Sequence, residues 1–101
     1  MQIRSGQRFR STVCDTAVVV VRGGEVDLRC GGDPMVAIDD TASETGGSPA
    51  EGFDSGTQLG KRYWDEESEI ELMCTAGGDG ALSVGERILT FKPAKPLPSS
   101  D

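Results

Sequence analysis

The sequence predicts a small, mostly β domain of short antiparallel strands, and three observations lead to this fold class. Several segments alternate apolar with polar residues, which is the period of a strand with one buried face. Fourteen glycines and five prolines in 101 residues favour turns over long helices. Two parts of the chain also resemble one another, so we expect two related units within one domain over residues 1–101.

The internal similarity rests on two matches. The letters GQRF at 6–9 return as GKRY at 60–63. The letters EVDLRCGGD at 25–33 are echoed by EIELMCTAGGD at 69–79. Each copy of the second motif ends an alternating strand in a cysteine and then reaches a Gly-Gly-Asp turn.

These matches place the first unit at about 6–38 and the second at about 57–92. They also predict that Cys30 and Cys74 occupy equivalent positions in the two units. If the units pair with one another, the two cysteines are expected to lie at pseudo-equivalent places.

Four strands are expected in the first unit. Residues 17–21 form a continuous run rich in β-branched side chains, which predicts a strand buried on both faces. Two glycines at 23–24 predict a hairpin turn, because glycine takes positive φ without cost. The other expected strands are residues 8–13, 26–30 and 35–38.

The second unit is expected to contain a similar set of strands. One strand runs through residues 63–64, an acidic turn follows at 65–68, and an alternating strand ends at Cys74. Residues 81–84 and 87–91 form a closing hairpin.

Two segments lack strand patterns. Residues 39–56 are small, acidic and glycine-rich, with Phe53 as the one large apolar side chain, and are expected to form a long mobile loop. Residues 93–101 are proline-rich, which favours an extended tail, and they include a P-x-x-P pattern.

The charge balance excludes several function classes. A net charge of −7 and a pI near 4.5 argue against binding to nucleic acid or to anionic membranes. Three cysteines form no dense disulfide pattern, and the chain shows neither a signal-peptide pattern nor a membrane-spanning apolar run. We therefore expect a cytoplasmic protein.

The chain contains no histidine. This removes the commonest general base, the usual partner of a catalytic serine or cysteine, and the commonest zinc ligand. No glycine-rich phosphate loop precedes a predicted helix. We expect no catalytic residues and no enzyme activity.

One pattern in the first third of the chain combines two cysteines, a valine run and several glycines at defined spacings. The chain reads G-x-x-F-R-S-x-x-C at 6–14, a valine run at 18–21, a Gly-Gly pair, and L-x-C-G-G-x-P-M at 28–35. This resembles the desulforedoxin domain, which also forms the N-terminal part of desulfoferrodoxins. The family pattern is roughly Gly-x-x-Tyr-Lys-Cys-x-x-Cys, a valine-rich strand, a glycine turn and Leu-x-Cys-Cys-Gly-x-Pro-Met. The resemblance covers about residues 6–36.

The resemblance implies four cysteine thiolates around one iron and a two-fold dimer. Cys14 matches the second ligand and Cys30 the third. Ser11 and Gly31 stand where the first and fourth cysteines would be. Half of the ligand set is absent, because glycine has no side-chain donor and a serine hydroxyl is a poor ligand for such a soft site.

A rebuilt metal site is one alternative. Cys14, Cys30 and Cys74 are its candidate iron or zinc ligands, with Asp33, Asp79 or water in the fourth position. The cysteines otherwise serve as small buried apolar residues, which is the interpretation we favour, or as a redox thiol or disulfide. We expect no cofactor, with iron or zinc as the alternative.

The favoured function is a non-catalytic accessory module that binds another protein, on a desulforedoxin-like scaffold whose metal site is lost or rebuilt. Tyr63 and Trp64 are the candidate partner-binding residues, although core packing also explains them. A homo-oligomer is a further expectation. The alternatives are a rubredoxin-type electron-transfer or structural metal protein and an enzyme with Cys14 or Cys30 as nucleophile.

Overall fold

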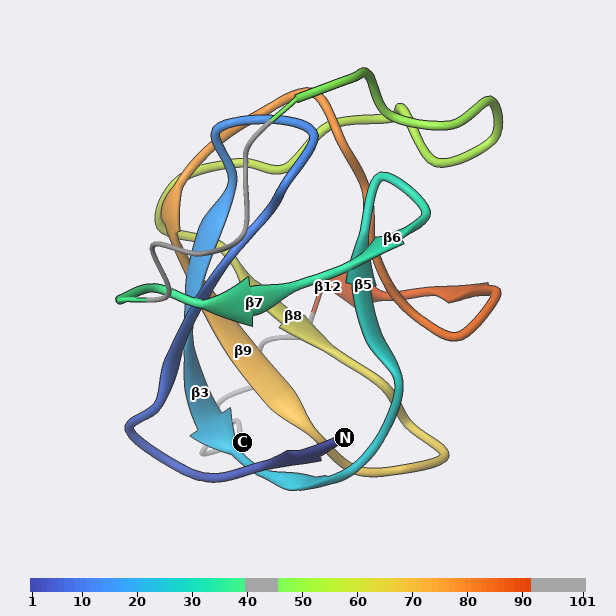
Figure 1. Cartoon of the computed structure of the whole chain (residues 1–101). Helices are drawn as coiled ribbons and strands as arrows, with labels where there is room; N and C mark the ends of the chain where they lie inside the picture. Colours follow the sequence, from blue (N-terminus) through green and yellow to red (C-terminus); the bar gives the residue numbers. More distant parts are fainter. Residues whose placement is uncertain (40–45, 92–101) are drawn as a thin grey trace, which may run out of the picture.

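A computed structural model describes residues 1–39 and 46–91, and all regular structure in these residues is β-strand (Figure 1). The strands form three antiparallel sheets, so the predicted small all-β fold is confirmed. Within the described part of the chain, no helix is long and apolar enough to cross a membrane. The strands are β1 (Gln2–Ile3), β2 (Arg8–Arg10), β3 (Ala17–Arg22), β4 (Gly24–Glu25), β5 (Leu28–Cys30), β6 (Asp33–Pro34), β7 (Val36–Ala37), β8 (Arg62–Trp64), β9 (Glu71–Ala76), β10 (Leu82–Val84), β11 (Arg87–Ile88) and β12 (Thr90–Phe91).

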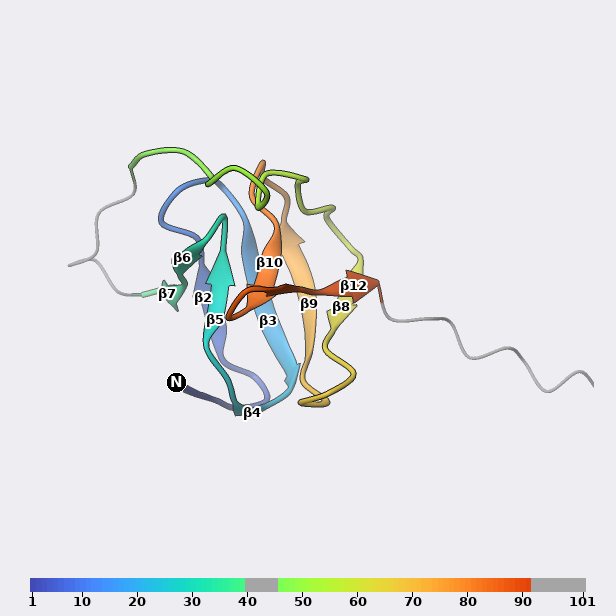
Figure 2. The same cartoon turned by 90° about the vertical axis from the view of Figure 1, so that its right-hand side faces the viewer.

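The core lies between a six-stranded sheet, in the order β12-β8-β9-β3-β2-β7, and a four-stranded sheet, in the order β11-β10-β5-β6. Figure 2 shows β5 and β10 in front of β3 and β9. Val18, Val20 and Leu72 enter the core from the larger sheet, and Leu28 and Leu82 enter it from the smaller one. A third sheet of two strands pairs β1 with β4.

The valine-rich strand β3 is buried on one face only. Val18 and Val20 are buried, Val19 is half-buried, and Val21 is 38% exposed. The expectation of a strand buried on both faces is therefore wrong, because none of the described residues forms a layer that fully covers the outer face of this sheet. The sequence run reflects β-propensity as well as burial.

Two predicted elements take a different form. The Gly-Gly segment expected as a plain hairpin turn contributes β4, which pairs with β1 through Ile3 and Gly24. The predicted strand 87–91 is divided into β11 and β12, because the chain passes from the four-stranded sheet to the six-stranded sheet at buried Leu89.

The segment expected as a mobile loop is only partly described, since residues 40–45 lie outside the described part. From residue 46 onward its backbone is hydrogen-bonded to the rest of the fold. Ala50 N–H donates to Gly31 O, and Ala81 N–H donates to Phe53 O. The segment thus lies against the ends of β5 and β10. The proline-rich tail expected at 93–101 lies outside the described residues.

The strand pairs of the first half of the chain occur again in the second half. Each residue and its counterpart are separated by the same number of positions as Phe9 and Tyr63. Phe9 pairs with Val18 in the first half, and Tyr63 pairs with Leu72 in the second. Backbone hydrogen bonds recur in the same way, as these matched donor–acceptor pairs illustrate: Gly6–Val20 and Gly60–Cys74, Ser11–Thr16 and Asp65–Ile70, Met35–Leu28 and Leu89–Leu82.

When each strand is replaced by its counterpart in the other half of the chain, the strand order of each larger sheet is simply reversed. The correspondence matches β2 with β8, β3 with β9, β5 with β10, β6 with β11, and β7 with β12. Where β3 meets β9 the pairing is reciprocal, since Val18 faces Cys74 while Leu72 faces Val20. Reciprocal contacts are the mark of a two-fold arrangement. Residues 6–37 and 60–91 therefore repeat one arrangement of strands.

The expected equivalence of Cys30 and Cys74 is wrong. Cys30 ends β5 and pairs with Leu82 in the four-stranded sheet, whereas Cys74 lies in β9 of the six-stranded sheet. The motifs around them look alike because both alternate apolar with charged residues, and any half-buried strand produces that pattern. In the observed correspondence, Ser68 occupies the position equivalent to Cys14, and Val84 occupies the position equivalent to Cys30.

Candidate functional site

Two of the three cysteines form a close pair near one end of the core. Cys14 lies in the loop between β2 and β3 and is partly exposed, while Cys30 is fully buried at the end of β5. Their Sγ atoms are 3.8 Å apart, and both thiols are free. We call Cys14 and Cys30 the thiol pair.

Buried hydroxyl groups connect the thiol pair to the second half of the chain. The Cys14 thiol donates to Thr16 Oγ1 at 3.2 Å, and Thr16 Oγ1 donates to Thr57 Oγ1 at 3.2 Å. Thr57 Oγ1 in turn donates to Gly80 O, and Gly80 N–H donates back to Cys14 Sγ at 3.4 Å. The network is closed, so Cys14 is held by residues that are distant in sequence.

Gly80 packs directly against both sulfur atoms. A Cβ atom at this position would lie 3.1 Å from Cys14 Sγ, 3.1 Å from Cys30 Sγ and 3.0 Å from Gly31 N. These approaches are tighter than ordinary van der Waals contacts, so any larger residue must displace a thiol or the backbone. The absence of a side chain at Gly80 therefore leaves room for the pair.

The two thiols have opposite pKa shifts. Burial raises the pKa of Cys14, but hydrogen bonds from Ser11, Thr16 and Gly80 outweigh it and lower this pKa to about 7. Burial and then the neighbouring Cys14 charge raise the pKa of Cys30 to about 12. Cys14, the partly exposed partner, is therefore the first thiol of the pair to ionise as the pH rises, while Cys30 keeps its proton.

Cys74 does not complete a metal-binding triad with the thiol pair. Its thiol donates to the Ala76 carbonyl at 3.2 Å, and burial raises its pKa. Within residues 1–39 and 46–91, no three His, Cys, Asp or Glu side chains are grouped to hold a metal ion. Two thiolates on one tetrahedral zinc, at about 2.3 Å each, would lie about 3.8 Å apart, which the pair satisfies.

The remaining donors beside the pair are the hydroxyl groups of Ser11 and Thr16, which are poor ligands for zinc or iron in a thiolate site. The described residues thus do not supply the ligand set that the desulforedoxin resemblance implies. Ser11 lies beside the thiol pair, since its hydroxyl group is hydrogen-bonded to both Cys14 and Cys30.

The corresponding place in the second half holds an ion pair instead of thiols. Asp65 occupies the position equivalent to Ser11 and is 5% exposed. Its carboxylate accepts two hydrogen bonds of 2.7 Å from the Arg87 guanidinium. Ser68 donates to the same carboxylate through its backbone N–H and its hydroxyl. The Arg87 hydrogen bonds hold the pKa of Asp65 well below its usual range, although burial opposes this.

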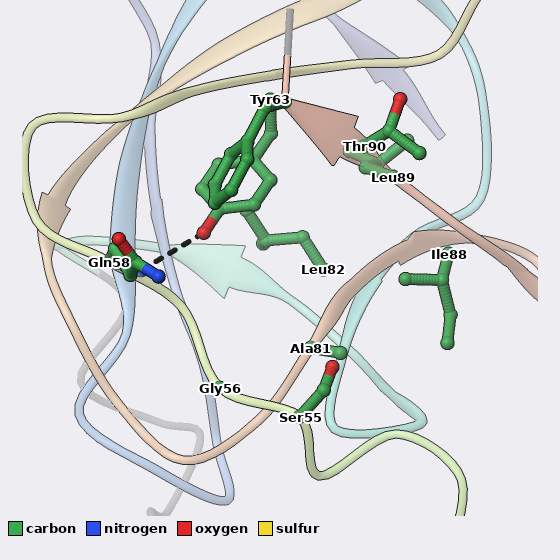
Figure 3. Close-up of a pocket in the computed structure, with 10 residues that line it drawn as sticks. Ser55, Gly56, Gln58, Tyr63, Ala81, Leu82, Ile88, Leu89 and Thr90 are labelled. Carbon is green, nitrogen blue, oxygen red and sulfur yellow. Dashed lines mark hydrogen bonds between the residues drawn. The ribbon is translucent and has the colours of Figure 1, made fainter.

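A second candidate site is a groove beside the outer strand β12. We call it the β12 groove, and it has a volume of about 330 Å³. Tyr63 forms one wall, and its ring meets that of Phe91 at a centroid distance of 5.1 Å and a tilt of 50°. Figure 3 shows the Tyr63 hydroxyl directed towards Gln58, whose backbone N–H donates to it at 3.0 Å. The lining residues are Ser55, Gly56, Gln58, Tyr63, Ala81, Leu82, Ile88, Leu89, Thr90 and Phe91.

The predicted partner-binding pair is divided between two environments. Tyr63 is buried and lines the β12 groove, whereas Trp64, the next residue of β8, is half-buried and is not among the lining residues. Successive side chains of a strand point to opposite faces, which explains the division.

Sequence reasoning missed several residues of both sites. Thr16, Thr57 and Gly80 carry no motif, and only the fold brings them to Cys14. Ile88 and Phe91 were expected to belong to a single strand of a closing hairpin. One signal was present, because Ile88 and Leu89 are adjacent apolar residues and only one of two successive strand side chains can face a single core.

No family model, curated protein or solved structure was found to match this chain. The resemblance to desulforedoxin stays a prediction that rests on the residues quoted for it.

Proposed function

We propose that this protein is a non-catalytic interaction module that binds an extended segment of a partner protein in the β12 groove. The observation that carries this proposal is the exposure of large apolar side chains along the groove. Phe91 is 50% exposed and Ile88 is 41% exposed, and both line the groove beside Tyr63. Burial of such apolar surface against a partner removes it from water and thereby stabilises the complex.

The position of β12 supports an extended partner segment. Among the strands of residues 1–39 and 46–91, β12 is the last in the order of the six-stranded sheet and pairs on one side only, through Thr90 with Trp64 and Phe91 with Tyr63. An edge strand offers backbone donors and acceptors to an added strand, and a neighbouring pocket then selects a side chain. The proposed partner therefore contributes one strand and one apolar side chain.

Charge narrows the chemistry of the partner. The net charge of −7 disfavours acidic segments and nucleic acid by long-range repulsion. We therefore propose a neutral or basic segment. A cytoplasmic setting belongs to the same proposal, because all three cysteines are free thiols and the cytoplasm keeps thiols reduced.

The rubredoxin-type alternative has narrower support. The 3.8 Å sulfur separation suits two ligands of one tetrahedral metal, but Cys74 bonds elsewhere. Elemental analysis of fresh protein distinguishes the two functions. About one iron or zinc per chain, lost in Cys14→Ser, Cys30→Ser and Cys74→Ser alike, would favour the metal protein.

The binding proposal is tested with peptides selected from a random library against the full chain. Ile88→Ser removes an apolar wall of the groove, and we expect the selected peptides to bind it at least about tenfold more weakly, which is about 1.4 kcal/mol. Isothermal calorimetry measures the change.

Ile38→Ser is the matched control, because Ile38 is 43% exposed beside β7, the strand that corresponds to β12. We expect this variant to bind within about twofold of the unchanged chain. Equal losses in the two variants, or a library that yields no binder, would refute the β12 groove as the site.

A further inference from the structure

The thiol pair is placed for chemistry between its own two sulfur atoms. The Sγ atoms are 3.8 Å apart, and both thiols are free. We propose that Cys14 and Cys30 form a redox-active pair, which a hydroperoxide oxidises to a disulfide and a dithiol returns to the free thiols. The site takes a small peroxide as its substrate and stores two electrons per chain.

The fold itself does not require thiols at these two positions. The second half repeats the same strand arrangement with Ser68 in place of Cys14 and Val84 in place of Cys30. A purely structural role would be filled as well by a hydroxyl group and a methyl-bearing side chain, as it is there. The pairing of two sulfur atoms in one half only therefore points to their chemistry.

Exposure assigns different roles to the two cysteines. Cys14 is partly exposed and accepts the Gly80 N–H, so it is the sulfur that a peroxide reaches and the one whose negative charge is stabilised. Cys30 has no exposed surface, so a peroxide in solvent does not reach it, and its sulfur lies 3.8 Å from that of Cys14. Cys14 is thus the attacking residue and Cys30 the resolving residue.

The chemistry balances with one peroxide per pair. The Cys14 thiolate attacks one peroxide oxygen, the O–O bond breaks, and Cys14 becomes a sulfenic acid, while hydroxide or an alkoxide leaves and takes a proton from solvent to become water or an alcohol. The Cys30 sulfur then attacks Cys14 sulfur, the S–S bond forms, the S–O bond breaks, and hydroxide leaves as water with the Cys30 proton. The two thiols lose two electrons, and the peroxide gains them.

Closing the bond requires a small movement. A disulfide has a sulfur separation of about 2.05 Å, so the sulfur atoms must approach by about 1.8 Å. Cys30 is fixed in β5 by its ladder partners Leu82 and Asp33. Cys14 lies in a loop, and the loop between β2 and β3 therefore makes the movement.

The test oxidises the full reduced chain with hydrogen peroxide, unfolds it in denaturant so that the buried thiols become accessible, alkylates it with N-ethylmaleimide, and measures the intact mass and the peptide map. We expect one alkylated thiol in place of three, a linked pair of peptides that contain Cys14 and Cys30, and recovery of all three thiols after dithiothreitol. The unchanged chain gives this result directly, so the test does not depend on any variant.

The variants assign the two steps. Cys30→Val copies the second half and removes the resolving thiol, so we expect a dimedone-trapped sulfenic acid on Cys14 and no internal disulfide. Cys14→Ser also copies the second half and is expected to form neither product. Cys74→Ser is the matched control and is expected to form the disulfide as fast as the unchanged chain.

Several results would overturn the proposal. These are three alkylatable thiols after peroxide treatment, a disulfide that includes Cys74, or a disulfide found only between two chains. Circular dichroism of each variant in the reduced state checks that the fold is retained, and the peptide map of the unchanged chain decides the question if a variant unfolds.

Discussion

Asp65 illustrates at the residue scale how burial decides what an ion pair contributes. Its carboxylate is 5% exposed and receives two Arg87 hydrogen bonds of 2.7 Å. The pair between Arg29 and Asp27 has the same distance, 2.7 Å, but its side chains are 35% and 51% exposed. An exposed pair contributes little, because water screens it and competes for both charges.

This contrast predicts an acid-dependent loss of stability that belongs to Asp65. A carboxyl whose pKa is lower in the folded than in the unfolded chain stabilises the fold above its ordinary pKa of about 4, and that stabilisation is lost as the pH falls towards the folded value. The free energy of unfolding, measured with urea, should therefore fall more between pH 6 and about pH 3 in the unchanged chain than in Asp65→Asn.

At pH 6 we expect Asp65→Asn to cost about 1.5 kcal/mol of unfolding free energy, the lower end of the range for hydrogen bonds to a charged group, because Arg87 is 48% exposed. Asp27→Asn should change the unfolding free energy by less than about 0.5 kcal/mol and keep the acid dependence of the unchanged chain. An Asp27→Asn variant that loses as much stability as Asp65→Asn would contradict this interpretation.

The thiols differ at the same scale. We expect iodoacetamide to modify Cys14 before Cys30 and Cys74, because only Cys14 has partial exposure, and the rate should rise through a midpoint near its pKa of about 7. Thr16→Val removes a hydroxyl group that lowers this pKa, so the midpoint should move upward, while Thr16→Ser should keep it near that of the unchanged chain. Peptide mapping after brief alkylation identifies the modified thiol, and faster modification of Cys30 would refute the assignment.

At the scale of elements, the turn between β8 and β9 is held in an unfavourable backbone conformation. Glu69 has φ of 62°, a left-handed value that costs a residue with a side chain about 1 kcal/mol. The conformation persists because Glu69 N–H donates to Asp65 O, which closes the turn beside the Arg87 ion pair. The tertiary ion pair and this backbone conformation are thus coupled.

Glu69→Gly should stabilise the fold by about 0.5 kcal/mol, since relief of the left-handed strain exceeds the added flexibility of the unfolded chain. Glu66→Gly is the matched control, because the same exchange in the same turn at an ordinary φ should destabilise. Thermal unfolding followed by circular dichroism measures both. A Glu69→Gly variant less stable than Glu66→Gly would show that the turn is not strained.

The elements also show what a sequence can and cannot predict here. The long strands β3 and β9 were predictable, because alternation and β-branching are local signals. The two-residue strands β4 and β6 were not, since they exist only through their pairing with β1 and β5. The same limit explains the mistaken match of Cys30 with Cys74, which relied on a local pattern.

At the scale of the whole molecule, the same arrangement of strands carries different side chains in its two halves. The first half carries the thiol pair at the loop between β2 and β3, and the second half carries the Asp65–Arg87 ion pair at the corresponding loop. The edges differ as well, because β12 ends in Phe91 where β7 ends in Ala37. The motifs GQRF and GKRY lie at matching positions of this arrangement, and the strand pairing defines the register.

The candidate sites could be predicted less fully than the fold. Cys14, Cys30 and Tyr63 were candidates from sequence, and the structure adds their surroundings. Cys74 lies apart from the thiol pair because its strand belongs to the other sheet, and Trp64 lies outside the groove because its side chain points to the opposite face of β8 from Tyr63. Both facts depend on how the strands assemble into sheets.

The central claim is that a partner segment adds to the outer edge of β12. The most direct measurement is an amide NMR titration of the ¹⁵N-labelled full chain with a selected peptide. We expect the largest shifts at Ile88, Leu89, Thr90 and Phe91, together with new hydrogen-exchange protection of β12 amide groups, and little change along β7. Shifts centred on β7 or spread over the outer face of β3, with β12 unaffected, would contradict the account.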